Sequence, residues 1–276
     1  MFTPFGFYKS PAGGYTPTDT DAIAYISEVE TQGGTLSDTD KEAVDDLYIG
    51  LKADSIYTKL KVMYPFMGAI SQSTAINGIS PTDADTTISW ALDLTGSANH
   101  TTAGITIPSG DEGYGDIADA PSDLLSSVND ASIGHYASDV LSGNGFVVAP
   151  SANTTSAGVR FQMYAESGGN LYPAIGNASF ASYDNGSAPI GRWIVSRDSS
   201  TSLVLYKNGA EVGTSTESNS GASLNTNSLR FFNASIASAN EVRGTYGFLF
   251  VGEGLDSTEA VNMDTAISTF LTDIGR

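Results

Sequence analysis

The chain has 276 residues, of which 40% are hydrophobic, enough to fill the core of one large domain or two small ones. Its 31 acidic and 12 basic residues give a formal net charge of −19, which repels phosphate backbones and anionic lipid headgroups, so neither nucleic acid nor a membrane is expected as a partner. The absence of cysteine excludes disulfides, thiolate metal sites and cysteine nucleophiles.

Residues 1–18 predict an extended arm, because prolines and glycines interrupt them. The arm is nevertheless aromatic, with Phe2, Phe5, Phe7 and Tyr8 among its side chains. Two alternatives follow: the arm packs back on its own domain, or it attaches the protein to a particle or a neighbouring subunit. The start lacks the basic region and unbroken apolar segment of a signal peptide, and no run of about 18 apolar residues predicts a membrane-spanning helix.

Residues 19–68 predict a small helical segment. Apolar residues recur at helical spacing over 19–34 and again after Ser37, which begins a capping-box-like sequence. A third helical piece is expected over 54–63, and Pro65 ends it. The apolar stripes of these short helices predict self-association, as a trimer if the protein is a fibre.

Residues 69–276 have the pattern of antiparallel strands, with short apolar runs between clusters of Gly, Ser, Asn and Asp. The clearest pair is 192–197 and 202–206. Asn208 and Gly209 then supply a tight hairpin turn into a third strand. Three successive strands of this kind form a meander.

The end of the chain predicts one more strand and one more helix. The nearly all-apolar run 246–251 predicts a central strand, and an amphipathic helix after Asp256 is expected to lie on the sandwich edge. The fold class expected is therefore mainly β: an antiparallel β-sandwich with a small N-terminal helical segment and a C-terminal helix.

Several motifs, taken in order, resemble one fold family. Gly191-Arg-Trp-Ile-Val195, Leu205-Tyr-Lys-Asn-Gly209 and Gly247-Phe-Leu-Phe-Val-Gly-Glu-Gly254 resemble the second half of concanavalin-A-like/laminin-G-like jelly rolls. The resemblance implies a jelly-roll sandwich over residues 69–276, in which a strand near the end of the domain leads to a short helix.

With the segments upstream, the order of motifs resembles surface proteins of tailed-bacteriophage virions. The segments are 54–68, Gly113-Tyr-Gly-Asp116 and Ile133-Gly-His-Tyr136. This resemblance implies a jelly roll on a tail fibre, a head fibre or a capsid decoration protein. Other virion proteins are then its partners, and it is made in the host cytoplasm and placed on the virion surface. The resemblance transfers no catalytic residue.

Catalytic patterns are missing from the sequence. A glycoside hydrolase needs two carboxylates on a strand or on neighbouring strands, whereas Glu166, Glu211 and Glu253 lie at expected turns and strand ends. His100 and His135, expected as a loop histidine and a strand-end histidine, have no serine, carboxylate or second ligand at a motif spacing. We therefore expect no enzyme, no catalytic residue and no cofactor.

The densest acidic cluster contains Asp111, Glu112, Asp116, Asp119 and Asp123, of which the first three are the calcium candidates. Carboxylate-rich loops suit calcium, but no EF-hand register is present, so an exposed acidic loop is preferred to a calcium site.

Tyr183, Asp184 and Asn185 form the best candidate for a ligand site, because an aromatic face beside carboxylate and amide groups suits sugar recognition. The same residues also make a good turn. Trp90 and Trp193 are flanked by alternating strand residues and are expected in the core.

The preferred hypothesis is a non-enzymatic phage virion structural protein that is displayed on the particle and adheres to host glycans. One alternative is a polysaccharide-degrading enzyme on the same fold. The other is a lectin-like module of a bacterial cell surface, which the missing secretion signal disfavours.

Overall fold

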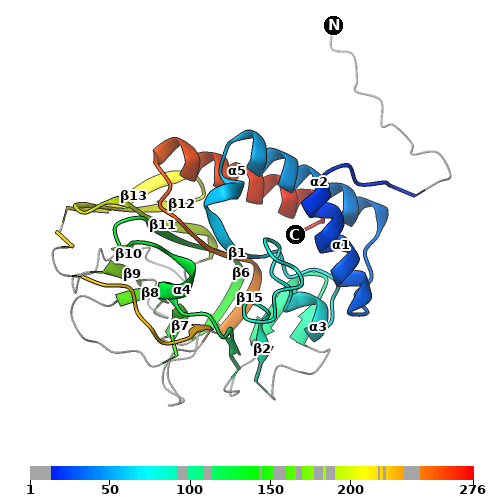
Figure 1. Ribbon diagram of the computed structural model, residues 1–276, viewed down its shortest axis with the longest axis horizontal. Coiled ribbons are helices and arrows are strands. Elements are labelled where there is room, and N and C mark those ends of the chain that lie inside the picture. Colours follow the sequence, from blue (N-terminus) through cyan, green and yellow to red (C-terminus); the bar gives the residue numbers. More distant parts are fainter. Residues whose placement is uncertain are drawn as a thin grey trace, which may run out of the picture.

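The computed structural model describes residues 14–91, 99–107, 113–142, 145–151, 160–165, 170–176, 183–184, 190–216, 218–219, 222–232 and 243–276. In these ranges the chain forms two antiparallel β-sheets packed face to face, with helices over one sheet (Figure 1). The predicted mainly β sandwich with N-terminal helices and a C-terminal helix is confirmed. No helix in the described ranges is long and apolar enough to cross a membrane.

The larger sheet has eight strands among the described residues, in the order β13-β12-β11-β6-β15-β4-β3, with β1 also paired to β15. β15 is central, as the apolar run 246–251 predicts, because β6 pairs along one side of it while β1 and β4 pair with the other. The strands are β1 (Leu60–Tyr64), β3 (His100–Thr101), β4 (Gly104–Ile107), β6 (Ala131–Ser142), β11 (Gly191–Ser199), β12 (Ser202–Lys207), β13 (Ala210–Ser215) and β15 (Arg243–Gly252).

The smaller sheet has seven described strands, in the order β10-β9-β8-β7-β14-β5-β2. They are β2 (Ser89–Trp90), β5 (Gly115–Asp116), β7 (Gly145–Pro150), β8 (Arg160–Ala165), β9 (Asn170–Gly176), β10 (Tyr183–Asp184) and β14 (Leu229–Phe231). A short helix, α4 (Pro121–Leu124), follows β5.

The predicted meander is confirmed as β11, β12 and β13. The turn between β12 and β13 has positive φ at both central residues, +49° at Asn208 and +76° at Gly209. This is the conformation that matches the right-handed twist of a hairpin, and Asn-Gly adopts it with little strain.

Between the sheets lies an apolar core to which both contribute. Alternation along β11 places Trp193 and Val195 in this core and Ile194 on the opposite face. The core position predicted for Trp193 is confirmed, since its side chain is fully buried.

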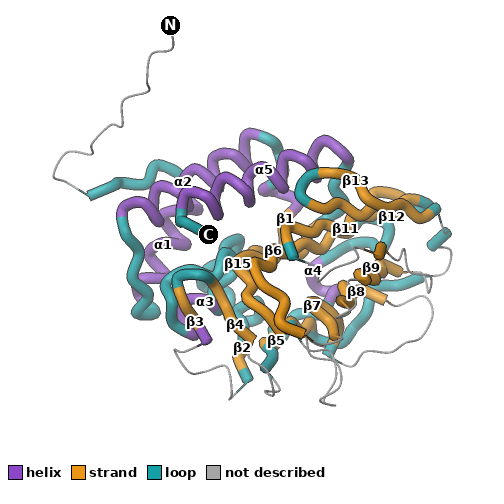
Figure 2. The backbone as a smooth tube through the Cα atoms, turned by 180° about the vertical axis from the view of Figure 1, so that it is seen from behind, coloured by secondary structure: helices purple, strands orange, loops and turns teal. Residues whose placement is uncertain are grey.

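The outer face of the larger sheet is also apolar, and helices cover it (Figure 2). They are α1 (Thr20–Thr31), α2 (Asp38–Ala53) and α5 (Ser257–Asp273). Phe248 and Phe250 of β15 face the helices, whereas Leu249 and Val251 face the core between the sheets. The Phe248 ring meets Phe270 of α5 edge to face, with centroids 5.9 Å apart. β15 is therefore buried on both faces.

The predicted starts of the helices are confirmed by their caps. Asp19 accepts hydrogen bonds from backbone N–H groups in the first turn of α1. Ser37 with Asp40 and Asp256 with Glu259 form capping boxes at α2 and α5. Each cap satisfies backbone donors that have no partner inside the helix.

The prediction of a third helical piece over residues 54–63 is wrong. A single 3-10 turn, η1 (Tyr57–Lys59), leads into strand β1. Val62 and Tyr64 of β1 enter the core between the sheets, and Met63 enters the helical layer. Because both faces of β1 contact a core, four of its five residues are apolar and they do not alternate strictly with polar ones. Periodicity does not distinguish such a pattern from a buried helix.

The prediction that the C-terminal helix lies on the sandwich edge is also wrong. α5 lies across the outer face of the larger sheet, beside α2 (Figure 1). Its Ile267, Phe270 and Leu271 are buried there. An edge position would leave the apolar outer faces of β11 and β15 in water, so burial favours the face.

Both histidines are buried in strands, not at the loop and strand-end positions predicted for them. His100 of β3 is 1% exposed, and its Nδ1 lies 2.7 Å from Oγ1 of Thr74. His135 lies within β6, with Nδ1 2.8 Å from Sδ of Met163. Burial lowers the pKa of His135 to about 3, so this ring is neutral in the folded protein at neutral pH.

The side chain of Arg276 ties the C-terminus to three separate strands and loops. Its guanidinium donates to the backbone carbonyls of Thr102, Pro65, Gly247 and Phe66 at 2.6 to 3.2 Å. Burial lowers its pKa to about 10. The four carbonyl dipoles offset part of this cost of burial, so the group stays charged at neutral pH, and its bond to Gly247 fixes the end of the helical layer to β15.

The buried neutral His135 predicts a loss of stability in acid. Unfolded histidine titrates near 6.5 and folded His135 at about 3, so between these values the unfolded state binds more protons and the free energy of unfolding falls as the pH drops. The expected slope is up to about 1.4 kcal/mol per pH unit. Denaturant unfolding should show that His135→Gln loses less stability than the native chain between pH about 7 and about 4.5. Equal losses in the two proteins would contradict this assignment.

Candidate functional site

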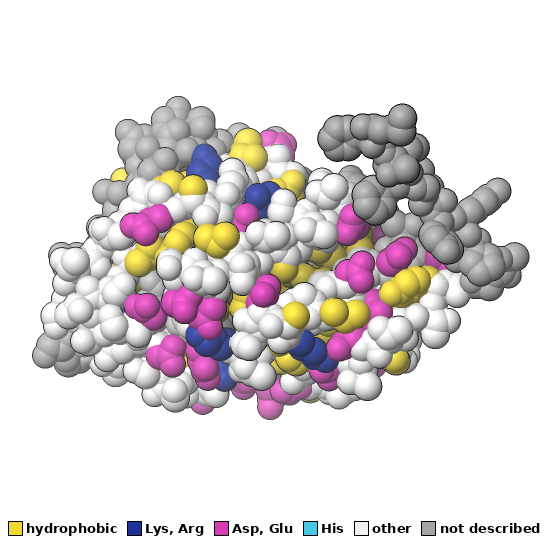
Figure 3. Space-filling view, turned by 90° about the horizontal axis from the view of Figure 1, so that it is seen from above, with side chains coloured by type: hydrophobic (Ala, Val, Ile, Leu, Met, Phe, Trp, Pro, Cys, Tyr) yellow, Lys and Arg dark blue, Asp and Glu magenta, His cyan; other side chains and the backbone are white. Residues whose placement is uncertain are grey.

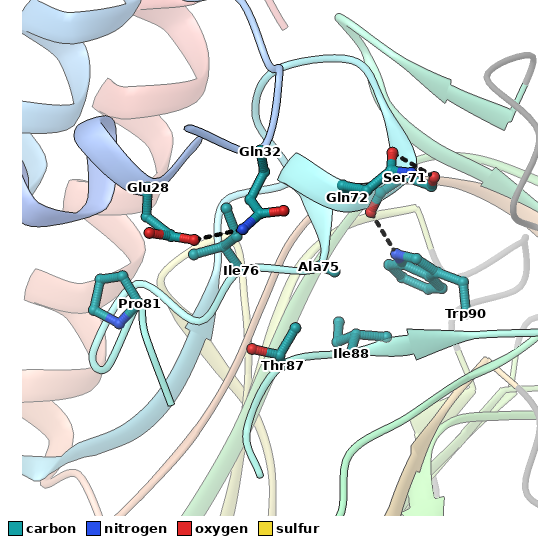
Figure 4. Close-up of a pocket in the computed structure, with 10 residues that line it drawn as sticks. All are labelled: Glu28, Gln32, Ser71, Gln72, Ala75, Ile76, Pro81, Thr87, Ile88 and Trp90. Carbon is teal, nitrogen blue, oxygen red and sulfur yellow. Dashed lines mark hydrogen bonds between the residues drawn. The ribbon is translucent and has the colours of Figure 1, made fainter. Parts of the chain in front are cut away.

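A cleft lies where the end of α1 meets the short helix α3 (Ser71–Thr74) and the edge strand β2 (Figure 4). Its volume is about 300 Å³, enough for a small ligand. Trp90 stands at one end of the cleft, and Glu28 and Pro81 stand at the other (Figure 4). Its described walls are Glu28, Gln32, Ser71, Gln72, Ala75, Ile76, Pro81, Thr87, Ile88 and Trp90.

Trp90 is fixed by a hydrogen bond and by aromatic packing. Its Nε1 donates to the backbone carbonyl of Ser71 at 3.0 Å. Its ring stacks on Phe232, with centroids 6.4 Å apart and 14° between the planes, and meets His100 edge to face at 5.3 Å. The side chain stays half-buried and lines the cleft. A ring that is already fixed loses little conformational freedom when a ligand binds.

The glycine at position 115 sets how closely Trp90 approaches the neighbouring strand. β2 pairs with β5 so that Trp90 lies opposite Gly115. A Cβ atom at Gly115 would lie 2.7 Å from Cζ3 of Trp90 and 2.5 Å from Cγ2 of Ile88. The positions of Ile88 and Trp90, which both line the cleft, therefore depend on the absence of a side chain at position 115.

A buried amide holds the loop that leads into β2. Asn77 accepts a hydrogen bond from the backbone N–H of Met63 at 2.9 Å and donates to Oγ1 of Thr86 at 3.1 Å. The hydroxyl of Tyr64 donates to the carbonyl of Thr86 at 2.6 Å. These bonds join the wall of the cleft to β1, so the site rests on the sandwich itself.

Most polar groups of the cleft come from α3 and from the end of α1, where Gln32 is the C-cap residue. The amide of Gln32 donates to Oε1 of Glu28 at 2.7 Å, and the hydroxyl of Ser71 donates to Oε1 of Gln72 at 3.0 Å. Both glutamines are exposed, and Glu28 is half-buried. Carboxylate, amide and hydroxyl groups thus surround an apolar floor, an arrangement that suits a polar ligand with one apolar face.

Trp90 packs against the core, as expected, but it also forms part of this cleft. The polar residues of the cleft were not predicted. Glu28 and Gln32 are four positions apart on the polar face of a helix, a spacing typical of solvated residues, so no local signal marks them.

Of the predicted acidic cluster, Asp116, Asp119 and Asp123 are described, and the carboxylate of Asp116 is matched by a guanidinium. Its two Oδ atoms accept hydrogen bonds from Arg230 at 2.7 and 2.9 Å. Asp111 and Glu112 lie outside the described residues. In the part of the chain that the structure describes, no three acidic or histidine side chains are grouped to hold a metal ion. Calcium binding by the cluster stays a prediction.

The backbone of Tyr183 and Asp184 forms β10, opposite Leu171 and Asn170 of β9. The remaining predicted site groups lie outside the described part of the chain: the side chains of Tyr183 and Asp184, and all of Asn185, Phe2, Phe5, Phe7 and Tyr8. Their roles in ligand binding, attachment or oligomerisation stay predictions.

No protein-family model matches the chain, and no curated protein sequence matches it. Among solved structures, the binding domain of botulinum neurotoxin serotype D is similar, with a TM-score of 0.52 and 9% sequence identity. The match covers 76% of this chain and 52% of the toxin chain, so it spans about half the length of that structure. At this identity the likeness shows the shared β-sandwich fold.

A second similar structure is domain 4 of an extracellular GH43 arabinanase from Geobacillus stearothermophilus, solved in complex with arabinotriose. Its TM-score is 0.45 at 15% identity, and the match covers 75% of this chain and 98% of that domain. That TM-score is too low to carry an argument about this chain.

The close approach at Gly115 predicts a sensitive position. Gly115→Ala should push Ile88 and Trp90 out of place and lower the free energy of unfolding by about 1–3 kcal/mol, the usual cost of overpacking. The matched control is Gly213→Ala on β13, where an added Cβ meets no atom within 4 Å. Denaturant unfolding and the indole NMR signals measure both effects: the Trp90 signal should move in Gly115→Ala and not in Gly213→Ala. Equal stability of the two variants would show that the cleft does not depend on Gly115.

Proposed function

We propose that this chain is a non-enzymatic carbohydrate-binding module and that the cleft beside Trp90 is its binding site. The observation that carries the proposal is the fixed, half-buried indole at one end of a cleft whose rim supplies amide, hydroxyl and carboxylate groups. A sugar ring has matching surfaces, because C–H groups cover one face and hydroxyls surround its edge. The indole takes the C–H face, and the rim takes the hydroxyls.

The rim residues divide this recognition among them. The carboxylate of Glu28 accepts hydrogen bonds from sugar hydroxyls, while the amides of Gln32 and Gln72 both donate and accept. The carboxylate of Glu28 and the net charge of −19 disfavour anionic sugars. The expected ligands are therefore neutral sugars.

The fold gives independent support. The similar toxin structure is described as a binding domain, and it has the same sandwich architecture. A single small cleft binds one ligand weakly, so a module of this kind gains avidity when many copies are displayed together.

The absence of catalysis is part of the proposal. Hydrolysis of a glycosidic bond requires a carboxylic acid and a second carboxylate on opposite sides of the bond. Among the described residues that line the cleft, Glu28 is the one carboxylate. This composition supports binding without turnover.

Trp90→Ala tests the binding site. Calorimetric titration with a panel of neutral oligosaccharides should find a ligand for the native chain, and Trp90→Ala should bind it at least about tenfold more weakly, a loss of about 1.4 kcal/mol. The loss follows from removing the ring face that the sugar covers.

Tyr57→Ala is the matched control, because Tyr57 is a half-buried aromatic residue near Lys52 on the helical side and does not line the cleft. It should keep native affinity. A panel without any ligand, or a Trp90→Ala protein that binds like the native chain, would refute the proposed site.

We further propose that the module is displayed on the surface of a tailed-phage particle, as decoration protein, head fibre or tail fibre. The order of the sequence motifs supports this location. The same proposal includes self-association of the chain and its binding to other virion proteins. Immunogold electron microscopy of purified particles should label the head or the tail. Label confined to the surface of bacterial cells would instead support the lectin-like module of a cell.

A further inference from the structure

Residues 14–19 run along one side of α2. The Asp45 carboxylate, 1% exposed, accepts hydrogen bonds from the hydroxyl of Tyr15 at 2.8 Å, from the N–H and hydroxyl of Thr18 at 2.9 and 3.0 Å, and from the N–H of Asp19 at 2.8 Å. Burial acts to raise the pKa of Asp45, but these hydrogen bonds outweigh it and hold the pKa below its usual value. The segment is therefore firmly attached to the helix.

The direction of this segment shows where residues 1–13 join it. Gly14 lies beside the first turn of α2, where a Cβ on Gly14 would be 3.0 Å from Oδ1 of Asp38. At the last turn, Lys52 donates to Asp19 at 2.7 Å. Residues 1–13, which lie outside the described residues, thus connect at the first turn of α2.

A groove opens between α2 and α5, on the outer surface of the helical layer. Its volume is about 220 Å³, large enough for an aromatic side chain. Small residues create it, since Gly50 of α2 and Ala266 of α5 leave space above the buried Leu47 and Phe270. A Cβ added at Gly50 would meet no atom within 4 Å.

A second hollow continues the groove toward the first turn of α2. It shares Ala43, Asp46 and Asp273 with the groove and adds Thr39 and Glu42. The two hollows together lead from the place where residues 1–13 join the helix to the middle of the helical face.

The rim of these hollows is acidic. Figure 3 looks down on the helical face, where acidic side chains border apolar ones. Burial and the charges of Glu42, Asp45 and Asp273 raise the pKa of Asp46. Within the described ranges no Lys or Arg forms an ion pair with Glu42, Asp46 or Asp273. A cation here would relieve their mutual repulsion.

The sequence of residues 1–13 has the complementary chemistry. It contains Lys9 and no acidic residue, although the whole chain has a net charge of −19. Its aromatic residues are Phe2, Phe5, Phe7 and Tyr8.

We propose that the groove between α2 and α5 binds the arm of its own chain, residues 1–13, with an aromatic side chain in the groove and Lys9 against the acidic rim. Of the two alternatives for the arm, the geometry favours packing on its own domain. The covalent link to Gly14 also favours packing on the same domain, because a segment joined to the chain has a high effective concentration at a nearby site.

The arm is long enough for this path. Thirteen extended residues reach about 45 Å, at roughly 3.3–3.6 Å each. α2 has 16 residues and is about 24 Å long. The arm can therefore pass around the first turn of α2 and lie along the whole groove.

A nitroxide spin label in the groove tests the proposal in the full chain. The chain contains no cysteine, so Thr269→Cys, an exposed residue that lines the groove, takes a single label. The amide NMR signals of residues 1–13 should lose most of their intensity and regain it when the nitroxide is reduced. Thr214→Cys, exposed on β13 at the edge of the larger sheet, is the matched label position and should leave these signals unchanged.

Gly50→Leu supplies a second test, because leucine favours a helix and its side chain fills the groove. In this variant the signal loss caused by the Thr269 label should disappear. Two results would overturn the proposal. One is full intensity of the amide signals of residues 1–13 with the label at position 269 and Gly50 unchanged, and the other is an undiminished loss of these signals in Gly50→Leu. A mixed sample distinguishes the arm's own chain from a second copy: isotope-labelled protein without nitroxide is combined with unlabelled protein that carries the nitroxide. Signal loss in this mixture would place the arm on a second copy and would also overturn the proposal.

Discussion

The central strand β15 presents apolar side chains to both faces of the larger sheet, so each face must be covered. The smaller sheet covers Leu249 and Val251, and the helical layer covers Phe248 and Phe250. The ring of Phe250 lies over Gly134 of β6, where a side chain would collide with it. Each square ångström of apolar surface left open would cost roughly 25 cal/mol. The helices therefore share one core with the sheet that they cover.

This constraint also sets the position of the cleft. α1 is held by its buried residues in the helical layer, which places Glu28 and Gln32 at its end, while Trp90 belongs to the smaller sheet. The cleft therefore lies between a helix of the helical layer and the edge strand of the smaller sheet. The hydrogen bonds of Asn77 and Tyr64 connect the loop before β2 to β1, which pairs with β15. These hydrogen bonds hold the wall of the cleft to the sandwich.

Local patterns in the sequence predict most of the elements, including the central strand β15, but they misassign the short strand β1. α1, α2 and the β11–β13 meander have clear periodicity, caps and turn residues, and all of them form. The sequence of β1 resembles that of a helix because a strand that contacts a core on each face has no strict alternation. The position of α5 depends on which sheet face is apolar in three dimensions. The cleft was missed because its residues come from different layers, and no spacing in the sequence connects Glu28 with Trp90.

The two tryptophans report directly on whether the cleft beside Trp90 binds a neutral sugar. Trp90 lines the cleft, and Trp193 is sealed between the sheets, so their two indole N–H signals report on separate places. NMR titration of the isotope-labelled protein with neutral oligosaccharides should move the Trp90 signal to saturation and leave the Trp193 signal in place. A sugar that binds while the Trp90 signal stays unchanged would show that the binding site lies elsewhere on the protein.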